Sequence, residues 1–298
     1  MSSNTRHVLL VNPSAGGGRT RKLLPEVEGA LAAHGLEHRV VLTRSLEHAR
    51  QEALAATGSG ETPVVMSGDG LIGQIGGALA GSDTVMGVIP GGRGNDLARV
   101  LGIPTEPEAA VKVLEAGETR VIDVGEANGE RFLCVASCGF DSDANRIANE
   151  AKLIKGRLVY AYAALRALAA WKPARFEITL DGEGREFRGY SVAAANSKAF
   201  GGGMFVAPDA RLDDGELDVV TVGDVPRFRY LRRLPQVFDG SHVDNEEVTV
   251  DRAAEVRIQA DRPFAVYADG EHLTDLPATL RVLAGALRVI APPGPVSA

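Results

Sequence analysis

Two carboxylates in glycine-rich loops are the residues of this sequence best suited to chemistry. Asp69 lies in the run SGDG at residues 67–70, and Asp96 closes the run PGGRGND at residues 90–96. Glycines let backbone N–H groups approach phosphate oxygens, and Arg93 offers a charge-assisted contact. Acids beside an anion cradle are typical of sites that hold Mg²⁺ between protein and phosphate. The two loops therefore predict a nucleoside triphosphate with Mg²⁺.

Other glycine-loop sites are less well supported. Residues 68–73 match the pattern G-x-G-x-x-G, which would indicate a dinucleotide site. The match follows the third apolar run rather than the first, and the next run, VMGVIP, does not end in the expected acid. The phosphate-loop pattern G-x-x-x-x-G-K-[ST] does not occur. A simpler alternative is that Asn95 and Asp96 only cap a helix.

The elements that would position these loops alternate along the first hundred residues. Four short apolar runs (HVLLV, HRVVL, PVVMS and VMGVIP) are each followed by a polar or glycine-rich loop and a helical pattern. This repetition predicts a parallel sheet with helices on both faces, and the loops then share one edge of the sheet. The expected helices lie at about residues 19–34, 47–56, from 71 onward, 96–101 and 108–115.

The second half of the chain has a different sequence pattern. Alternating apolar runs separated by Asn-Gly and Asp-Gly pairs are typical of antiparallel hairpins. Helices are expected near residues 141–152, 158–171 and 227–238, and the last two apolar runs, ATLRVL and ALRVIAPP, are expected as strands. We therefore predict an α/β domain over residues 1–121 and a β-rich antiparallel domain over 122–285. The last strand, near 286–292, is expected to return to the first domain.

Composition excludes several classes of protein. The 298 residues are 45% hydrophobic and 24% charged, as in soluble globular proteins, and the net charge of −7 argues against nucleic acid as a partner. Cys134 and Cys138, the only cysteines, have no His or Cys cluster nearby, which favours buried thiols over zinc. No apolar run is long enough for a signal peptide or membrane span. We expect a cytoplasmic protein, at most peripheral at the inner face of the membrane, with a homodimer left open.

An ordered set of motifs extends over nearly the whole chain: NPSAGGG at 12–18, SGDG at 67–70, PGGRGNDLAR at 90–99, GGG at 201–203, APDA at 207–210, DDG at 213–215 and DGE at 269–271. This ordered set resembles the bacterial diacylglycerol kinases and related lipid kinases. The resemblance implies a nucleotide-binding α/β domain, a β-rich second domain, ATP and Mg²⁺ in the cleft between them, and transfer of the γ-phosphoryl group to a lipid hydroxyl.

The resemblance also implies roles for individual residues. Asp69 and Asp96 would orient Mg²⁺ directly or through water. The positions that would contact the nucleotide are Asn12, Thr43, Ser67, Gly68, Asp69, Gly70, Leu71, Gly92, Arg93 and Asn95.

Two departures from the family pattern bear on the substrate. The usual Gly-Gly-Asp-Gly-Thr is here Ser67-Gly68-Asp69-Gly70-Leu71, as in the sphingosine and ceramide kinase branch, and Arg93 replaces a usual threonine. The Asn95-Asp96 pair is similar to the diacylglycerol kinases. Diacylglycerol is therefore the favoured acceptor. The alternatives are sphingosine or ceramide, a soluble acceptor as in NAD kinases, which share the Gly-Asp-Gly loop, and a nucleotide-binding protein without turnover.

The remaining family roles fall in the second domain. The resemblance implies a general base in DGE, for which we favour Glu271 with Asp269 supporting it, because a lipid hydroxyl must lose its proton to attack phosphorus. An isolated Asp-Gly pair more often marks only a turn, and the copy at Asp181 receives no further role. The DDG motif resembles a structural metal loop with a side-chain ligand from Asp214 and carbonyl ligands from Arg211 and Glu216. A plain turn is the alternative.

Two segments combine apolar and basic residues, as a protein surface that contacts lipid would. One has Leu158, Tyr162, Leu165 and Leu168 at near-helical spacing. The other, PRFRYLRRLP at residues 226–235, interleaves arginines with Phe228, Tyr230 and Leu231. Either could contact an anionic bilayer. The alternative is that both are helices packed on their own domain with a solvated basic face.

Overall fold

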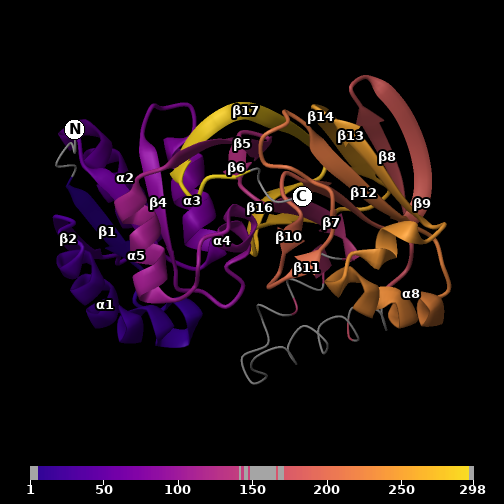
Figure 1. Ribbon diagram of the computed structural model, residues 1–298. Helices are drawn as coiled ribbons and strands as arrows, with labels where there is room; N and C mark the ends of the chain where they lie inside the picture. The colour runs from indigo at the N-terminus through magenta and orange to yellow at the C-terminus, as the bar shows by residue number, and fades with distance from the viewer. Residues whose placement is uncertain (1–5, 141, 144–146, 148–165, 167–170, 295–298) are drawn as a thin grey trace.

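The first half of the chain forms a parallel sheet, as the alternating pattern predicts (Figure 1). The computed structural model describes residues 6–140, 142–143, 147, 166 and 171–294. The strands lie in the order β4, β3, β1, β2, and Val11 at the end of β1 lies opposite both Leu42 and Met66. The loops that follow these strands therefore share one edge of the sheet. The strands are β1 (His7–Val11), β2 (His38–Leu42), β3 (Thr62–Ser67) and β4 (Val85–Pro90).

Helices cover both faces of this sheet because side chains alternate along each strand. Leu9 and Val11 pack with α1 and α5 on one face, whereas Val8 and Leu10 pack with α2 and α3 on the other. The predicted helices are thus all present, with bounds that differ by a few residues. They are α1 (Ala15–Ala33), α2 (Leu46–Ser59), α3 (Asp69–Leu79), α4 (Asp96–Leu101) and α5 (Pro107–Ala116).

The second half is a β-rich antiparallel structure with its own core, as predicted. Large aromatic side chains fill this core, where Tyr190, Phe176 and Phe140 are almost completely buried. The strands are β5 (Thr119–Ala127), β6 (Glu130–Phe132), β7 (Val135–Gly139), β8 (Ala174–Leu180), β9 (Glu183–Ala195), β10 (Ala199–Phe200), β11 (Met204–Phe205), β12 (Leu217–Gly223), β13 (Val248–Ala253), β14 (Glu255–Ala260), β15 (Ala265–Ala268) and β16 (Glu271–Asp275).

The two strands expected near the C-terminal end are a single strand, β17 (Ala278–Ile290). Its register shifts between Leu283 and Leu287, where Gly285 has a φ of 59°. A glycine with positive φ interrupts the regular pairing at this point, but the strand continues beyond the irregularity. β17 pairs antiparallel with β14 and β5 and parallel with β4, so it joins the two halves into one sheet. The domain boundary near residue 121 stays a prediction.

The helical segments of the second half are only partly described. The segment expected as one helix over 227–238 is an α-helix, α8 (Arg227–Arg233), followed by the 3₁₀ helix η1 (Leu234–Phe238), and a second 3₁₀ helix, η2 (Ser241–Asp244), comes after it. Most of the expected helices over 141–152 and 158–171 lies outside the described residues, as do Leu158, Tyr162, Leu165 and Leu168. Within the described part of the chain, no helix is long and apolar enough to cross a bilayer.

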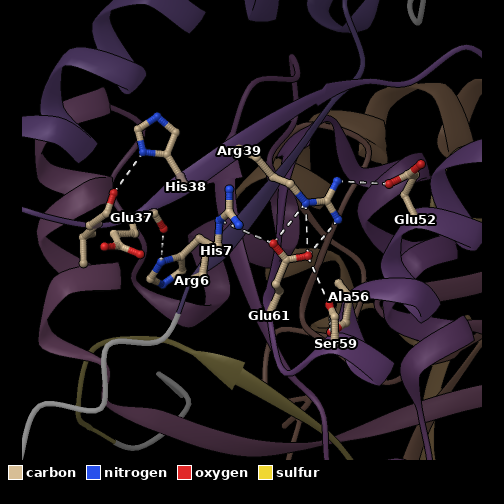
Figure 2. A network of polar contacts seen from close by, with 10 residues as sticks. Arg6, His7, Glu37, His38, Arg39, Glu52, Ala56, Ser59 and Glu61 are labelled. Atoms are coloured by element: carbon tan, nitrogen blue, oxygen red, sulfur yellow. Dashed lines mark hydrogen bonds and ion pairs between the residues drawn. The ribbon is translucent and has the colours of Figure 1, made fainter.

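A polar network ties the edge strand β2 to α2 and β3. Figure 2 shows Arg39 between Glu61, which it contacts through Nε and Nη2 at 2.8 to 3.1 Å, and Glu52, at 3.3 Å. The Ser59 hydroxyl also donates to Glu61 at 3.2 Å. The hydrogen bonds from Arg39 lower the pKa of Glu61, so the carboxylate is charged at neutral pH.

Replacing Glu61 with glutamine should lower the free energy of unfolding by about 1–2 kcal/mol, because a bidentate, charge-assisted contact with little solvent exposure is lost. The difference should shrink in acid, since the stability from a carboxylate with a lowered pKa is lost as pH falls through that pKa. Urea unfolding measures it. Glu186→Gln is the matched control, because Glu186 also pairs with an arginine, Arg175, but both side chains are exposed. Equal effects of the two variants would contradict this account.

Candidate active site

Three glycine-rich loops meet at the shared edge of the parallel sheet. A methyl group added to Gly92 would lie 2.5 Å from Cα of Gly68, and one added to Gly16 would lie 2.6 Å from the carbonyl oxygen of Gly91. The Gly91 N–H also donates to the Ser67 carbonyl at 2.8 Å. Glycine is needed here because the backbones are in direct contact. The sequence motifs at 12–18, 67–70 and 90–96 therefore form one surface.

Asp69 fixes the relation between α3 and α4. Its Oδ1 accepts hydrogen bonds from the backbone N–H groups of Asp96 at 2.6 Å and Leu97 at 3.4 Å, so it caps the start of α4 from a neighbouring loop. Its Oδ2 lies beside Gly94, where an added methyl group would be 2.9 Å away. One carboxylate oxygen thus organises the loop, and the other faces Gly94.

Asp96 links the first half of the chain to the second. Its two carboxylate oxygens accept the N–H groups of Gly202 and Gly203, at 2.8 and 2.9 Å. These glycines lie in the β10–β11 turn, so the acid expected to orient a metal also anchors a loop of the β-rich half. The sequence singled out residues 201–203 as a motif, but nothing in it pointed to this partner.

The two carboxylates lie close enough to affect each other. Burial raises the pKa of Asp69, against its hydrogen bonds to backbone N–H groups. Burial also raises the pKa of Asp96 to about 6, and the negative charge of Asp69 adds to the shift. Two neighbouring buried carboxylates disfavour their ionised forms, and a cation between them would relieve the repulsion. The described residues hold no cluster of three or more His, Cys, Asp or Glu side chains that could bind a metal.

The turn between β15 and β16 brings Glu271 to this surface from the second half of the chain. Its Cγ and Oε1 lie 3.3 Å from the position of a methyl group on Gly70, directly beside Asp69 in sequence. No described residue forms a hydrogen bond or ion pair with its carboxylate. The side chain is exposed, yet the surrounding protein partly desolvates the carboxylate and so raises its pKa.

Asp269, on the same turn, is engaged by the backbone. Its two oxygens accept the N–H groups of Leu133 at 2.8 Å and Cys134 at 3.0 Å. Burial raises its pKa to about 6 despite these bonds. An added methyl group on Gly73 would lie 2.7 Å from Asp269 Oδ2, so the turn packs tightly against α3. Asp269 therefore holds the turn in place and Glu271 has the freer carboxylate.

The Asp-Gly-Glu sequence also occurs in the turn between β8 and β9, which shows what the motif does without a neighbouring site. Asp181, between β8 and β9, has a φ of 46°, against 51° for Asp269. Its oxygens accept two consecutive N–H groups, those of Ala254 and Glu255, at 3.1 and 2.8 Å. Glu183, the counterpart of Glu271, is exposed. The motif itself builds a turn, and only the copy at 269–271 lies against the glycine loops.

The other residues expected at a nucleotide line the same edge. Asn12 Oδ1 accepts the Ser14 N–H at 3.0 Å, and Thr43 donates from its hydroxyl to the Val11 carbonyl at 3.2 Å. Ser67 is buried at the end of β3, and Leu71 packs partly on the core at the start of α3. Arg93 is exposed, and its Nη2 lies 3.5 Å from a methyl position on Gly17.

Asn95 shapes the loop from within. Its φ of 53° is left-handed, which asparagine tolerates better than most residues. Its amide oxygen accepts the Gly92 N–H at 2.8 Å, and its amide nitrogen donates to the Gly92 carbonyl at 3.3 Å. A buried asparagine bonded in this way positions the loop glycines, and its contact with nucleotide stays a prediction.

In the loop expected to hold a structural metal, the carboxylates pair with arginine side chains. Asp214 forms an ion pair with Arg252, which also contacts Glu216 at 2.8 Å, and Asp214 accepts the Glu216 N–H at 3.3 Å. Arg211 pairs with Asp213 at 3.0 Å. The guanidinium of Arg252 offsets the charge of Asp214, so the loop does not require a metal for neutrality. The metal assignment of Arg211, Asp214 and Glu216 stays a prediction.

Sequence reasoning missed two buried acids near this loop. Asp123 accepts the N–H groups of Gly215 at 2.7 Å and Gly285 at 2.6 Å, so it ties the loop to the irregular part of β17. Asp218 lies on β12, where burial raises its pKa to about 6, and Arg252 partly offsets the shift. The available signal was an acid within an apolar strand, which usually has a specific partner.

Two family models match the chain along its length. The diacylglycerol kinase catalytic domain matches residues 6–127, and the YegS C-terminal NAD kinase beta sandwich-like domain matches residues 134–291. The three glycine loops with Asp69 and Asp96 therefore lie in the first match, and the turn bearing Glu271 lies in the second.

Curated relatives and a solved structure match almost the whole chain. A diacylglycerol kinase of Mycobacterium tuberculosis is 34% identical over 95% of this chain and 94% of its own length. A diacylglycerol kinase of Bacillus subtilis is 29% identical with 95% of each chain covered, and a probable lipid kinase YegS-like of Pseudomonas aeruginosa is 32% identical with 90% of each covered. The crystal structure of a putative diacylglycerol kinase from Bacillus anthracis superposes with a TM-score of 0.80 at 24% identity, covering 98% of this chain and 99% of that one, which shows the same fold.

Proposed function

The chain belongs to the diacylglycerol kinase family of lipid kinases, and on this premise we propose that it transfers the γ-phosphoryl group of ATP to the hydroxyl of diacylglycerol, forming phosphatidic acid. The observation that carries the proposal is the position of Glu271. A carboxylate from the β-rich half lies against Gly70, at the loops where backbone N–H groups can hold phosphates. An acid with no partner among the described residues is thus placed next to the expected phosphoryl donor.

The glycine loops would bind the triphosphate. Their backbones are in direct contact, so side chains are excluded and the loop backbones themselves would approach the phosphates at the carboxyl ends of the strands. Arg93 adds an exposed guanidinium beside Gly17. In phosphoryl transfer, such positioning and charge neutralisation provide most of the catalysis.

The carboxylate pair fits a Mg²⁺ ion that is shared with phosphates. Mg²⁺ in kinases is typically held by one or two carboxylates, with phosphates and water completing its coordination. Asp69 would hold the ion through Oδ2, while its Oδ1 keeps α4 in place. Asp96, with both oxygens bonded to the β10–β11 turn, would act directly or through water. When bound, the ion neutralises charge on the phosphate oxygens.

Glu271 would act as the general base. It would accept the proton of the lipid hydroxyl as the bond from oxygen to phosphorus forms, and ADP would leave. Asp269 supports this role by anchoring the turn to the N–H groups of Leu133 and Cys134.

A panel of acceptors tests the function. The purified chain would be given γ-labelled ATP and Mg²⁺ with diacylglycerol, sphingosine, ceramide or NAD in detergent micelles. We expect label in the organic phase, in phosphatidic acid. Label in sphingosine or ceramide would move the acceptor to the other lipid branch, and label only in NADP would assign a soluble acceptor. No transfer to any acceptor would contradict the proposal.

The pH dependence of kcat should follow the carboxylates of Glu271 and Asp96. Glu271 accepts a proton only when ionised, and Asp96, whose pKa is about 6, favours a cation only when ionised. The pKa of Glu271 is raised and that of Asp96 is raised to about 6, so kcat should fall as the pH decreases and these groups become protonated, which rates measured between about pH 5 and 8 would show. A rate that increases toward lower pH would contradict these roles.

Asp96 and Asp269 should make the ligand-free fold less stable as the pH rises. A carboxylate with a raised pKa binds its proton more tightly in the folded chain than in the unfolded one. Its stabilising contribution is therefore complete below the ordinary pKa of 3.8 and is lost as the pH rises through about 6.

A further inference from the structure

The helices α8 and η1 carry exposed apolar side chains. Phe228 is 77% exposed, Leu231 is 37% exposed and, at the end of η1, Phe238 is 49% exposed. Phe228 and Leu231 are three residues apart on α8, so they lie on one side of the helix. Phe228 is the most exposed large apolar side chain among the described residues, and exposed apolar side chains that gather in one segment indicate an interaction surface. We call the surface formed by Phe228, Arg229, Leu231, Arg232 and Phe238 the α8 face.

The opposite side of α8 is firmly attached to the β-rich core. Tyr230 is buried, stacks on Tyr190 with ring centroids 4.2 Å apart, and meets Phe140 edge to face at 4.9 Å. Leu234, four residues after Tyr230, packs on the same core. The helix is therefore held in place without Phe228 or Leu231. These two side chains can be changed without removing the contacts that fix the helix.

The α8 face is positively charged within an acidic protein. Residues 226–238 contain four arginines and no acid, although the whole chain has a net charge of −7. Arg233 pairs with Glu247, and Arg227 donates to the Trp171 carbonyl. Arg229 and Arg232 are exposed and pair with no acidic side chain among the described residues. Apolar side chains between arginines that pair with no described acid complement a bilayer, which has anionic headgroups above an apolar interior.

The α8 face is connected to the candidate active site through β10 and β11. η1 contacts β11, and β10 contacts α4, which begins at Asp96. The turn between β10 and β11 donates its N–H groups to the Asp96 carboxylate. In Figure 1 α8 lies on the same side of the molecule as β10 and β11, below the strands of the β-rich half. A membrane against this face would lie next to the site.

We propose that the α8 face docks the protein on an anionic lipid bilayer, with Phe228, Leu231 and Phe238 in the headgroup and acyl boundary and Arg229 and Arg232 at the lipid phosphates. The inference rests on the proposed function, since a kinase of diacylglycerol must meet its acceptor within a bilayer. An interface helix of this kind combines apolar insertion with electrostatic attraction. Docking here would deliver the lipid hydroxyl to Glu271 from the membrane side.

Vesicle sedimentation without ATP tests the docking independently of catalysis. The full chain should bind vesicles of phosphatidylcholine with phosphatidylglycerol more tightly than vesicles of phosphatidylcholine alone. Phe228→Ser with Leu231→Ser should weaken binding to the mixed vesicles by about tenfold or more, because buried apolar area is lost. Arg229→Gln with Arg232→Gln should weaken it by about fivefold for each arginine, and should abolish the preference for anionic lipid.

Two matched controls accompany these variants. Leu54→Ser removes an apolar side chain that is 52% exposed on α2, and Arg257→Gln removes an exposed charge on β14, at the opposite side of the β-rich half from α8 (Figure 1). Neither should change vesicle binding. The proposal would be overturned if the wild-type chain did not bind anionic vesicles, or if the control and α8-face variants behaved alike. It would also be overturned if the Phe228 and Leu231 variant changed a dimer to a monomer and left vesicle binding intact.

The outcome is separable from that of the proposed function. Phosphoryl transfer to a short-chain, water-soluble diacylglycerol does not require a bilayer, so the α8-face variants should retain wild-type rates with it. Transfer to the soluble acceptor without vesicle binding would overturn the docking and leave the kinase function standing. Vesicle binding that depends on the α8 face, without transfer to any acceptor, would support the docking and contradict the kinase function.

Discussion

Replacing Asp69 with asparagine is expected to lower kcat for phosphoryl transfer by roughly a thousandfold, while the chain stays folded. The asparagine oxygen can still accept the N–H groups of Asp96 and Leu97, so the start of α4 should keep its position. The variant loses the charge of Oδ2, the oxygen beside Gly94 that we assign to Mg²⁺. Initial rates with γ-labelled ATP and a melting curve together measure the effect.

Asp181→Asn is the matched control for this variant. Asp181 also accepts two consecutive backbone N–H groups, but it lies in the β8–β9 turn and has no expected ligand. Its substitution should leave kcat within about twofold of the wild type, with at most a small change in stability. An Asp69→Asn protein that retained wild-type activity would remove Asp69 from the catalytic site.

Glu271→Gln has the second large expected effect. Loss of a general base typically lowers rates by about 10² to 10⁴, and we expect kcat to fall in this range with little change in KM for ATP. Glutamine occupies the same space over Gly70 but cannot accept the proton. The melting temperature should not fall, because no described residue bonds to the Glu271 carboxylate.

The Asp-Gly-Glu turn between β8 and β9 provides the control for this variant as well. Glu183→Gln changes the same position in the β8–β9 turn and should have no effect on kcat. Asp269→Asn should lower both stability and kcat, because Asp269 anchors the turn through Leu133 and Cys134. If Glu271→Gln kept full activity and Asp269→Asn alone lost kcat with no loss of stability, Asp269 would be the base.

The sequence predicts the parallel half of the fold well because its signals are local. An apolar run, a glycine or polar loop and a helical pattern recur four times, and parallel strands bring their carboxyl ends to one edge. The contact between Gly68 and Gly92 follows from that geometry. The Asp-Gly turn at Asp269 could be predicted equally well, since such a pair defines its own hairpin.

Contacts between residues far apart in the chain could not be predicted in this way. That Glu271 lies over Gly70 depends on how β15 and β16 pack against α3, and no pattern near either residue encodes it. The bonds from Gly202 and Gly203 to Asp96, across more than a hundred residues, are of the same kind. The resemblance to the kinase family supplied Glu271 where the local sequence could only indicate a turn.

The most direct test of the central claim is transfer of label from γ-labelled ATP to diacylglycerol with Mg²⁺, comparing the wild type with Asp69→Asn and Glu271→Gln in one assay. We expect labelled phosphatidic acid from the wild type and almost none from either variant, with all three proteins folded. A wild-type protein that binds ATP but labels no diacylglycerol would contradict the claim, and so would variants that label it at the wild-type rate.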